Sequence, residues 1–138
     1  MSQYITPDEL KTHAYDEEIA SIIREDETIA LAAIDMAIEY AETFLMKSYD
    51  TALIFSKTGT ERSTLLVEFI KDVAIWKLIG LATPSIDYED KEKRFNIANG
   101  WFKSVYKGMP ANLPKKELEE SKSSSFSYKS NPKRENRY

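Results

Sequence analysis

The sequence predicts an all-α protein, a small bundle of four to five helices with two long central helices and an extended C-terminal tail. Apolar residues recur at steps of three or four along most of the first 107 residues, which is the helical period. Residues typical of helix starts and helix ends occur at intervals along the same stretch. The sequence shows no alternating strand pattern and no internal repeat that would favour another class.

Two short helices are expected first. The segment Thr6-Pro7-Asp8-Glu9 combines a capping side chain, a proline suited to the first helical position and a glutamate that can reach back to the cap. We therefore expect a helix from Pro7 to about His13. Asp16 can cap a second helix that ends near Arg24.

The two long helices follow. From Thr28 to Ser48 the apolar stripe is thinned by alanines, which lets a neighbouring helix approach closely. From Glu61 to Ala82 few positions are polar, so this helix should be the central element of the bundle, with Trp76 in the core. Thr83-Pro84 ends it, because a residue before proline disfavours the helical conformation.

The segment between the long helices, residues 49–60, is expected to be a connecting loop. It carries four consecutive apolar residues, and a loop of this kind is usually covered by another protein surface. We therefore predict that Leu53, Ile54 and Phe55 bind a partner. A last helix is expected from about Tyr88 to Lys107, with Gly108 as the residue just beyond its end.

Charge divides the chain into a helical domain, residues 1–114, and a C-terminal arm, residues 115–138. The domain holds 12 Lys and Arg against 19 Asp and Glu, a net charge of −7, whereas the arm holds seven against four, a net of +3. The arm is rich in serine and has too few apolar groups to offset the entropy of ordering. It should order only on a partner, using an interface set of aromatic and basic residues. The predicted set is Phe126, Tyr128, Lys133, Arg134, Arg137 and Tyr138. A solvated tail kept for solubility is the alternative.

Composition argues against most catalytic and membrane roles. The chain has no cysteine and a single histidine, His13, so it offers neither a thiolate nor a cluster of His ligands. Its acidic groups lack the spacing of a calcium loop, and Lys57-Thr58-Gly59-Thr60 lacks the order of a phosphate loop. We expect no enzyme activity, no metal and no cofactor. No signal peptide is apparent, and the most apolar stretch carries too many charges to span a bilayer.

Five short segments, taken in order, resemble a known family. They are Tyr4-Ile5-Thr6-Pro7-Asp8-Glu9-Leu10, the end of the alanine-thinned helix at Phe44-Leu45 with Tyr49-Asp50, the run Asp72-Val73-Ala74-Ile75-Trp76-Lys77-Leu78, Arg94-Phe95 with Ala98 and Trp101, and Lys107-Gly108. Over residues 4–113 they resemble the Mu-like prophage family that was first catalogued as a domain of unknown function. That family is similar to the head-to-tail connector, or head completion, proteins of long-tailed phages. The chain departs from the family in its short 50–61 connection and its long serine-rich arm.

The resemblance implies a non-enzymatic adaptor of the virion, present in the host cytoplasm during assembly. Such subunits form a homo-oligomeric ring, twelve-fold by resemblance, beneath the portal protein. The ring extends the channel through which DNA passes without sequence-specific binding, and it docks a tail-side stopper or tail completion protein. The alternative is a small helical interaction or nucleic-acid-binding module whose basic arm contacts phosphate.

Overall fold

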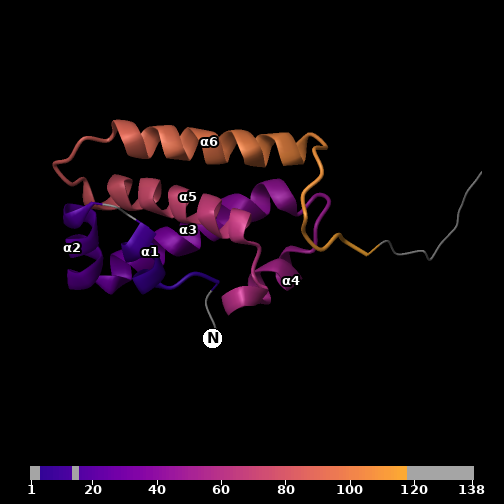
Figure 1. The fold of residues 1–138 in the computed structure, drawn as a ribbon, viewed down its shortest axis with the longest axis horizontal. Coiled ribbons are helices and arrows are strands. Elements are labelled where there is room, and N and C mark those ends of the chain that lie inside the picture. The colour runs from indigo at the N-terminus through magenta and orange to yellow at the C-terminus, as the bar shows by residue number, and fades with distance from the viewer. Residues whose placement is uncertain (1–3, 14–15, 118–138) are drawn as a thin grey trace, which may run out of the picture.

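The computed structural model describes residues 4–13 and 16–117, and this part of the chain contains six α-helices and no strand (Figure 1). The helices are α1 (Pro7–His13), α2 (Glu17–Glu25), α3 (Glu27–Leu45), α4 (Thr51–Ser56), α5 (Thr64–Ala82) and α6 (Glu89–Tyr106), with a short 3-10 helix, η1 (Gly59–Glu61), before α5. The all-α class is confirmed.

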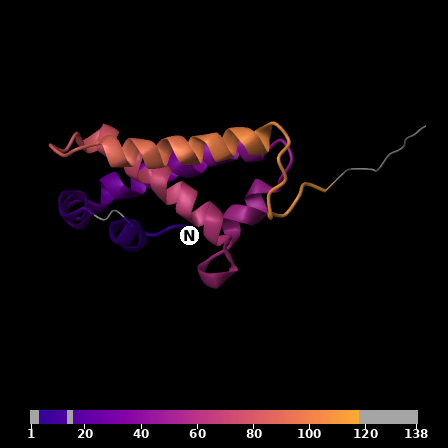
Figure 2. The same cartoon turned by 45° about the horizontal axis from the view of Figure 1, so that its top comes forward.

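Helix α5 is the centre of the bundle and packs against both α3 and α6. It buries side chains around most of its circumference, as its continuous apolar sequence predicts. Figure 1 shows α6 lying along α5, with the short helices α1 and α2 at one end of the molecule and α4 at the other. Figure 2 shows α5 diverging from α6 toward the end that carries α4.

The alanine stripe of α3 faces the core. Ala30, Ala33, Ala37 and Ala41 are fully buried, and α3 contacts α5 along this side. Near the C-terminal half of α3 the packing becomes aromatic: the ring of Tyr40 lies edge-on to that of Phe102, with centroids 5.6 Å apart. Trp76 is only half-buried, in a stack on Phe95, so it borders the core rather than filling it.

The helix ends follow the predicted signals closely. Thr6 and Glu9 form the reciprocal cap: the Glu9 amide donates to Thr6 Oγ1 at 3.2 Å, and the Thr6 amide donates to Glu9 Oε1 at 3.0 Å. Asp16 caps α2 through the amides of the next turn. Gly108 follows α6 with a φ of 124°, a conformation that favours glycine. Helix α3 begins one residue earlier and ends three residues earlier than expected.

The predicted loop at residues 49–60 is wrong, because most of it is helical. The Leu53 amide donates to the carboxylate of Asp50 at 3.1 Å, so Asp50 caps the one-and-a-half-turn helix α4. Helix η1 follows, and the central helix starts at Thr64 with Ser63 as its cap, three residues later than predicted. A short apolar run carries no clear period, which is why the pattern did not reveal α4.

The first residues of the predicted arm lie against the domain. The Asp50 amide donates to the carbonyl of Pro114 at 2.9 Å, and the Lys116 amide donates to the carbonyl of Ser48 at 3.1 Å. Lys115 thereby forms an isolated antiparallel bridge with Tyr49. The rest of the arm, including all six of its predicted partner-binding residues, lies outside the described residues.

Candidate functional site

The three domain residues predicted to bind a partner have different environments. Ile54 is 2% exposed and packs in the core of its own chain, and Phe55 is half-buried with its ring 5.0 Å from that of Tyr4. Leu53 is 45% exposed. The argument that a loop presents all three to a partner therefore fails, because α4 turns Ile54 and Phe55 toward their own domain. Leu53 stays available for a partner contact.

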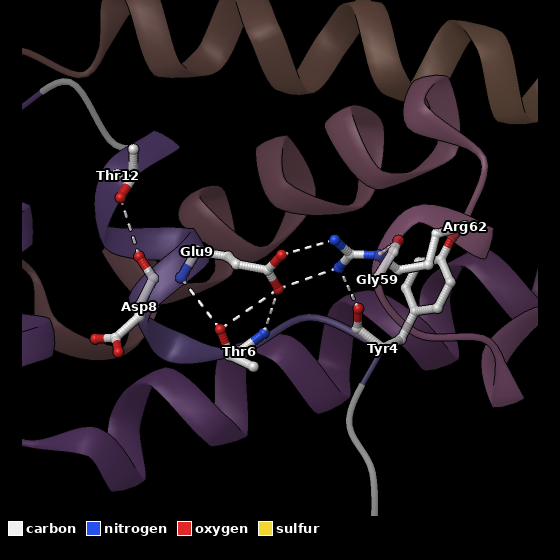
Figure 3. A network of polar contacts seen from close by, with 7 residues as sticks. All are labelled: Tyr4, Thr6, Asp8, Glu9, Thr12, Gly59 and Arg62. Carbon is white, nitrogen blue, oxygen red and sulfur yellow. Dashed lines mark hydrogen bonds and ion pairs between the residues drawn. The ribbon is translucent and has the colours of Figure 1, made fainter.

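Arg62, at the junction between η1 and α5, organises this end of the molecule (Figure 3). Its guanidinium donates to both carboxylate oxygens of Glu9, at 2.7 and 3.1 Å, to the carbonyl of Tyr4 at 2.7 Å and to the carbonyl of Gly59 at 2.8 Å. The planar fork of an arginine suits this bidentate contact. The N-terminal segment is thus tied to the start of the central helix.

The electrostatics of this network agree with its geometry. The hydrogen bonds from Arg62 lower the pKa of Glu9 below its ordinary value, and the same bonds raise the pKa of Arg62. Burial acts against both shifts and is the weaker effect. Both side chains are therefore ionised at neutral pH and hold Tyr4 in place.

A cavity of about 550 Å³ opens beside Arg62. Its apolar lining includes Ile54, Leu65 and Trp101, and residues 110–114 form one wall. Tyr4 also lines it, and the Tyr4 hydroxyl is buried with no hydrogen-bond partner among the described residues. This hydroxyl is closed off from solvent, so it lies within the fold, where a buried donor without an acceptor is costly, and not in the open space of the cavity.

The Tyr4 hydroxyl keeps its proton at physiological pH. Burial raises the pKa of Tyr4 to about 12, although the charge of Arg62 opposes the shift. The neutral phenol can donate one hydrogen bond and accept others. The lining of the cavity is mixed, because Lys57, Glu61 and Asn112 stand beside its apolar groups.

Exposed apolar side chains gather at the same end of the bundle as this cavity, and one of them, Leu65, lines the cavity itself. Helices α4, the start of α5 and the C-terminal ends of α3 and α6 meet there (Figure 1). The large exposed apolar residues on these elements, which we call the apolar end, are Met46, Leu53, Leu65, Tyr106 and Met109. Single exposed apolar residues are ordinary, but several at one end beside a cavity are typical of an interaction surface.

On the other side of Arg62 lies a second cavity of about 500 Å³ with a polar lining. His13, Lys71 and Arg94 contribute to it from three different helices. Behind it the buried carboxylate of Asp72 contacts His13 Nε2 at 2.8 Å and Arg94 at 3.9 Å. This cluster joins α1, α5 and α6, and its residues chiefly stabilise the packing of these three helices.

The sequence predicted neither the network around Arg62 nor the cluster around Asp72 in full. The sequence alone indicates no more than a polar residue near a helix end for His13, and for Arg94 an ion pair with Asp90, one turn earlier. The Arg94–Asp90 pair is present at 3.4 Å, but the contacts with Asp72 were missed. Glu9 was explained completely by its capping role, so nothing pointed to Arg62, which lies 53 residues away.

Within residues 4–13 and 16–117, no group of three or more His, Cys, Asp or Glu side chains is arranged to hold a metal ion. No helix in the same part of the chain is long and apolar enough to cross a membrane. No protein-family model matches the chain, and neither a curated protein nor a solved structure is similar to it.

Proposed function

We propose that this protein is a structural head-to-tail connector subunit of a tailed phage. In this role copies of the chain form a ring beneath the portal protein, extend the DNA channel and dock a tail-side stopper or completion protein. The subunit acts by contact and not by catalysis. Its place is the head-to-tail junction of the virion, after assembly in the host cytoplasm.

The observation that carries the proposal is the apolar end. A subunit of an assembly needs a surface that remains apolar in the free chain and is covered in the complex. Five large apolar side chains and a cavity of about 550 Å³ provide such a surface on a domain of this size. The rest of the domain is acidic, which favours repulsion of DNA over its retention in a channel.

The segments that carry the family resemblance also have structural roles that suit a shared fold. The first of them supplies Tyr4 and Glu9, which Arg62 holds. Another supplies the buried Asp72, and the last supplies Gly108 at the end of α6. Glu9 and Asp72 join helices through their side chains, and Gly108 supplies a backbone conformation that favours glycine, so several of the shared residues have a role in the fold.

The test is the size of the particle that the chain forms. We expect native mass spectrometry and negative-stain microscopy to show rings when the full chain is mixed with the portal protein encoded beside it. Leu65→Asp should abolish them, because a charge at the apolar end opposes its burial. Ile97→Asp is the matched control, since Ile97 is 65% exposed but lies in the middle of α6, away from that end.

The alternative, a module that binds nucleic acid through a basic arm, predicts a different result. Binding of DNA whose affinity falls steeply with salt, together with a chain that stays monomeric with and without the portal, would favour that alternative. The connector proposal would then be abandoned.

A further inference from the structure

The cavity beside Tyr4 has the size and lining of a site for a short polypeptide segment. Its volume of about 550 Å³ lies within the range of about 300 to 1,000 Å³ found for ligand sites. Trp101 offers apolar surface, and Leu65 lines the cavity with an exposed side chain. These groups suit an aromatic side chain, which gains most from apolar burial.

The lining also contains polar groups. Lys57, Glu61 and Asn112 border the cavity, and Arg62 does so as well. The occupant should therefore present an aromatic side chain within a segment that is otherwise polar.

The path of the chain places the C-terminal arm at the edge of this cavity. Pro114 lines the cavity, and the next residues run antiparallel to residues 48–50, with Lys116 bonded to Ser48. Helix α4, which lines the cavity through Ile54, begins at Thr51 and so lies in the opposite direction. The described chain therefore leads away from α4 as it reaches Glu117 (Figure 1).

We propose that the cavity beside Tyr4 receives the Phe126–Tyr128 segment of the C-terminal arm from a neighbouring copy of this chain. Phe126 would fill the apolar part of the cavity, and the serine-rich residues beside it would meet the polar part of the lining. Each copy would both offer a cavity and supply an arm, a head-to-tail arrangement that closes into a ring when the rotation between copies allows it.

The length and charge of the arm agree with exchange between copies. Phe126 is the ninth residue after Glu117, and an extended chain of nine residues reaches about 30 Å. This distance is close to the length of α5, whose 19 residues rise about 28 Å, so the segment can cross a neighbour of the same size. The arm has a net charge of +3 and the domain −7, which favours contact between them.

This inference rests on the self-association that the proposed ring requires, and it can be tested in the full chain. The double variant Phe126→Ala, Tyr128→Ala should weaken self-association by at least 10-fold in sedimentation or light scattering. The matched control, Ser121→Ala with Ser123→Ala, changes the same arm without its aromatic groups and should associate as the original chain does. Trp101 lines the cavity, so in a Trp76→Phe background its emission should respond to association and lose that response in the double variant.

The outcomes separate this inference from the proposed function. Rings that form equally well without Phe126 and Tyr128 would overturn the arm contact and leave the connector intact. A Trp101 response that is the same at every protein concentration, and that the double variant removes, would place the arm in its own cavity and overturn the exchange. A chain that never associates, alone or with the portal, would overturn the connector itself.

Discussion

Replacing Glu9 by glutamine separates the ion pair with Arg62 from the capping role of the same side chain. Glutamine serves at this position of a capping box as glutamate does, so the contact with Thr6 is retained. The change removes one negative charge from a site where Arg62 donates two hydrogen bonds at 2.7 and 3.1 Å. The exposed fractions of the two side chains are 33% for Glu9 and 14% for Arg62.

The magnitude follows from these distances and exposures. Two unit charges about 4 Å apart attract by about 4 kcal/mol at an effective dielectric constant of 20. Desolvation and side-chain ordering offset much of this, so that exposed pairs contribute up to about 1 kcal/mol, whereas hydrogen bonds to charged groups contribute about 1.5 to 3 kcal/mol. Because the Glu9–Arg62 pair lies between these cases, we expect Glu9→Gln to lower the free energy of unfolding by about 1 to 2 kcal/mol. The melting temperature should fall by roughly 4 to 8 °C.

The pH dependence has a defined sign. Arg62 lowers the pKa of Glu9 in the folded protein below the ordinary value of 4.5. The stabilisation is therefore fully present above about pH 4.5 and is lost as the pH falls through the folded pKa. Urea unfolding of the original chain and the variant should differ by a constant amount from pH 6 to 8, and the difference should shrink below pH 4.5.

Asp8→Asn is the control for this experiment. Asp8 lies on the same helix and pairs with Lys11 at 3.5 Å, but its side chain is 87% exposed, so its loss should cost less than about 0.5 kcal/mol. Equal effects of the two substitutions at pH 7 would refute the reasoning. So would a deficit in Glu9→Gln that persists unchanged at the lowest pH at which both proteins fold.

Four further substitutions test other parts of the fold. Phe102→Ala removes a fully buried ring and should cost about 3 to 5 kcal/mol in urea unfolding, whereas Trp76→Ala, at a half-buried site, should cost clearly less. Asp72→Asn should lower stability by about 1 to 3 kcal/mol, because it removes the buried charge that His13 contacts at 2.8 Å; an unchanged urea midpoint would contradict this. Thr83→Gly should raise the melting temperature, since Thr83 has a φ of 44° at the end of α5, where glycine avoids a penalty of about 1 kcal/mol.

Local signals in the sequence were enough for most of the helices. The cap at Thr6 and Glu9, the cap at Asp16 and the glycine after α6 each act within a few residues, so their geometry follows from the order of the residues themselves. Helix α4 was missed because its six residues are fewer than two helical turns and show no period. There the prediction failed for lack of length and not for lack of a cap.

The candidate site depends on contacts that local patterns do not contain. Glu9 and Arg62 are 53 residues apart, and His13 and Asp72 are 59 residues apart. Each of these side chains has a sufficient local explanation, as a cap, a helix end or a surface charge. Only the packing of α1 against α5 brings them together.

These two long-range contacts explain how the seven-residue helix α1 is held in place and how the segment before it contributes to the cavity at the apolar end. An isolated helix as short as α1 is not stable in water, so it must be held by the rest of the fold. Arg62 holds its N-terminal side through Glu9, and Asp72 holds its C-terminal residue His13. The same guanidinium fixes the carbonyl of Tyr4, whose ring forms one wall of the cavity at the apolar end. Charged contacts inside the fold therefore fix the shape of the cavity before any partner arrives. On binding, only the partner's arm has to become ordered, which lowers the entropic cost of the contact.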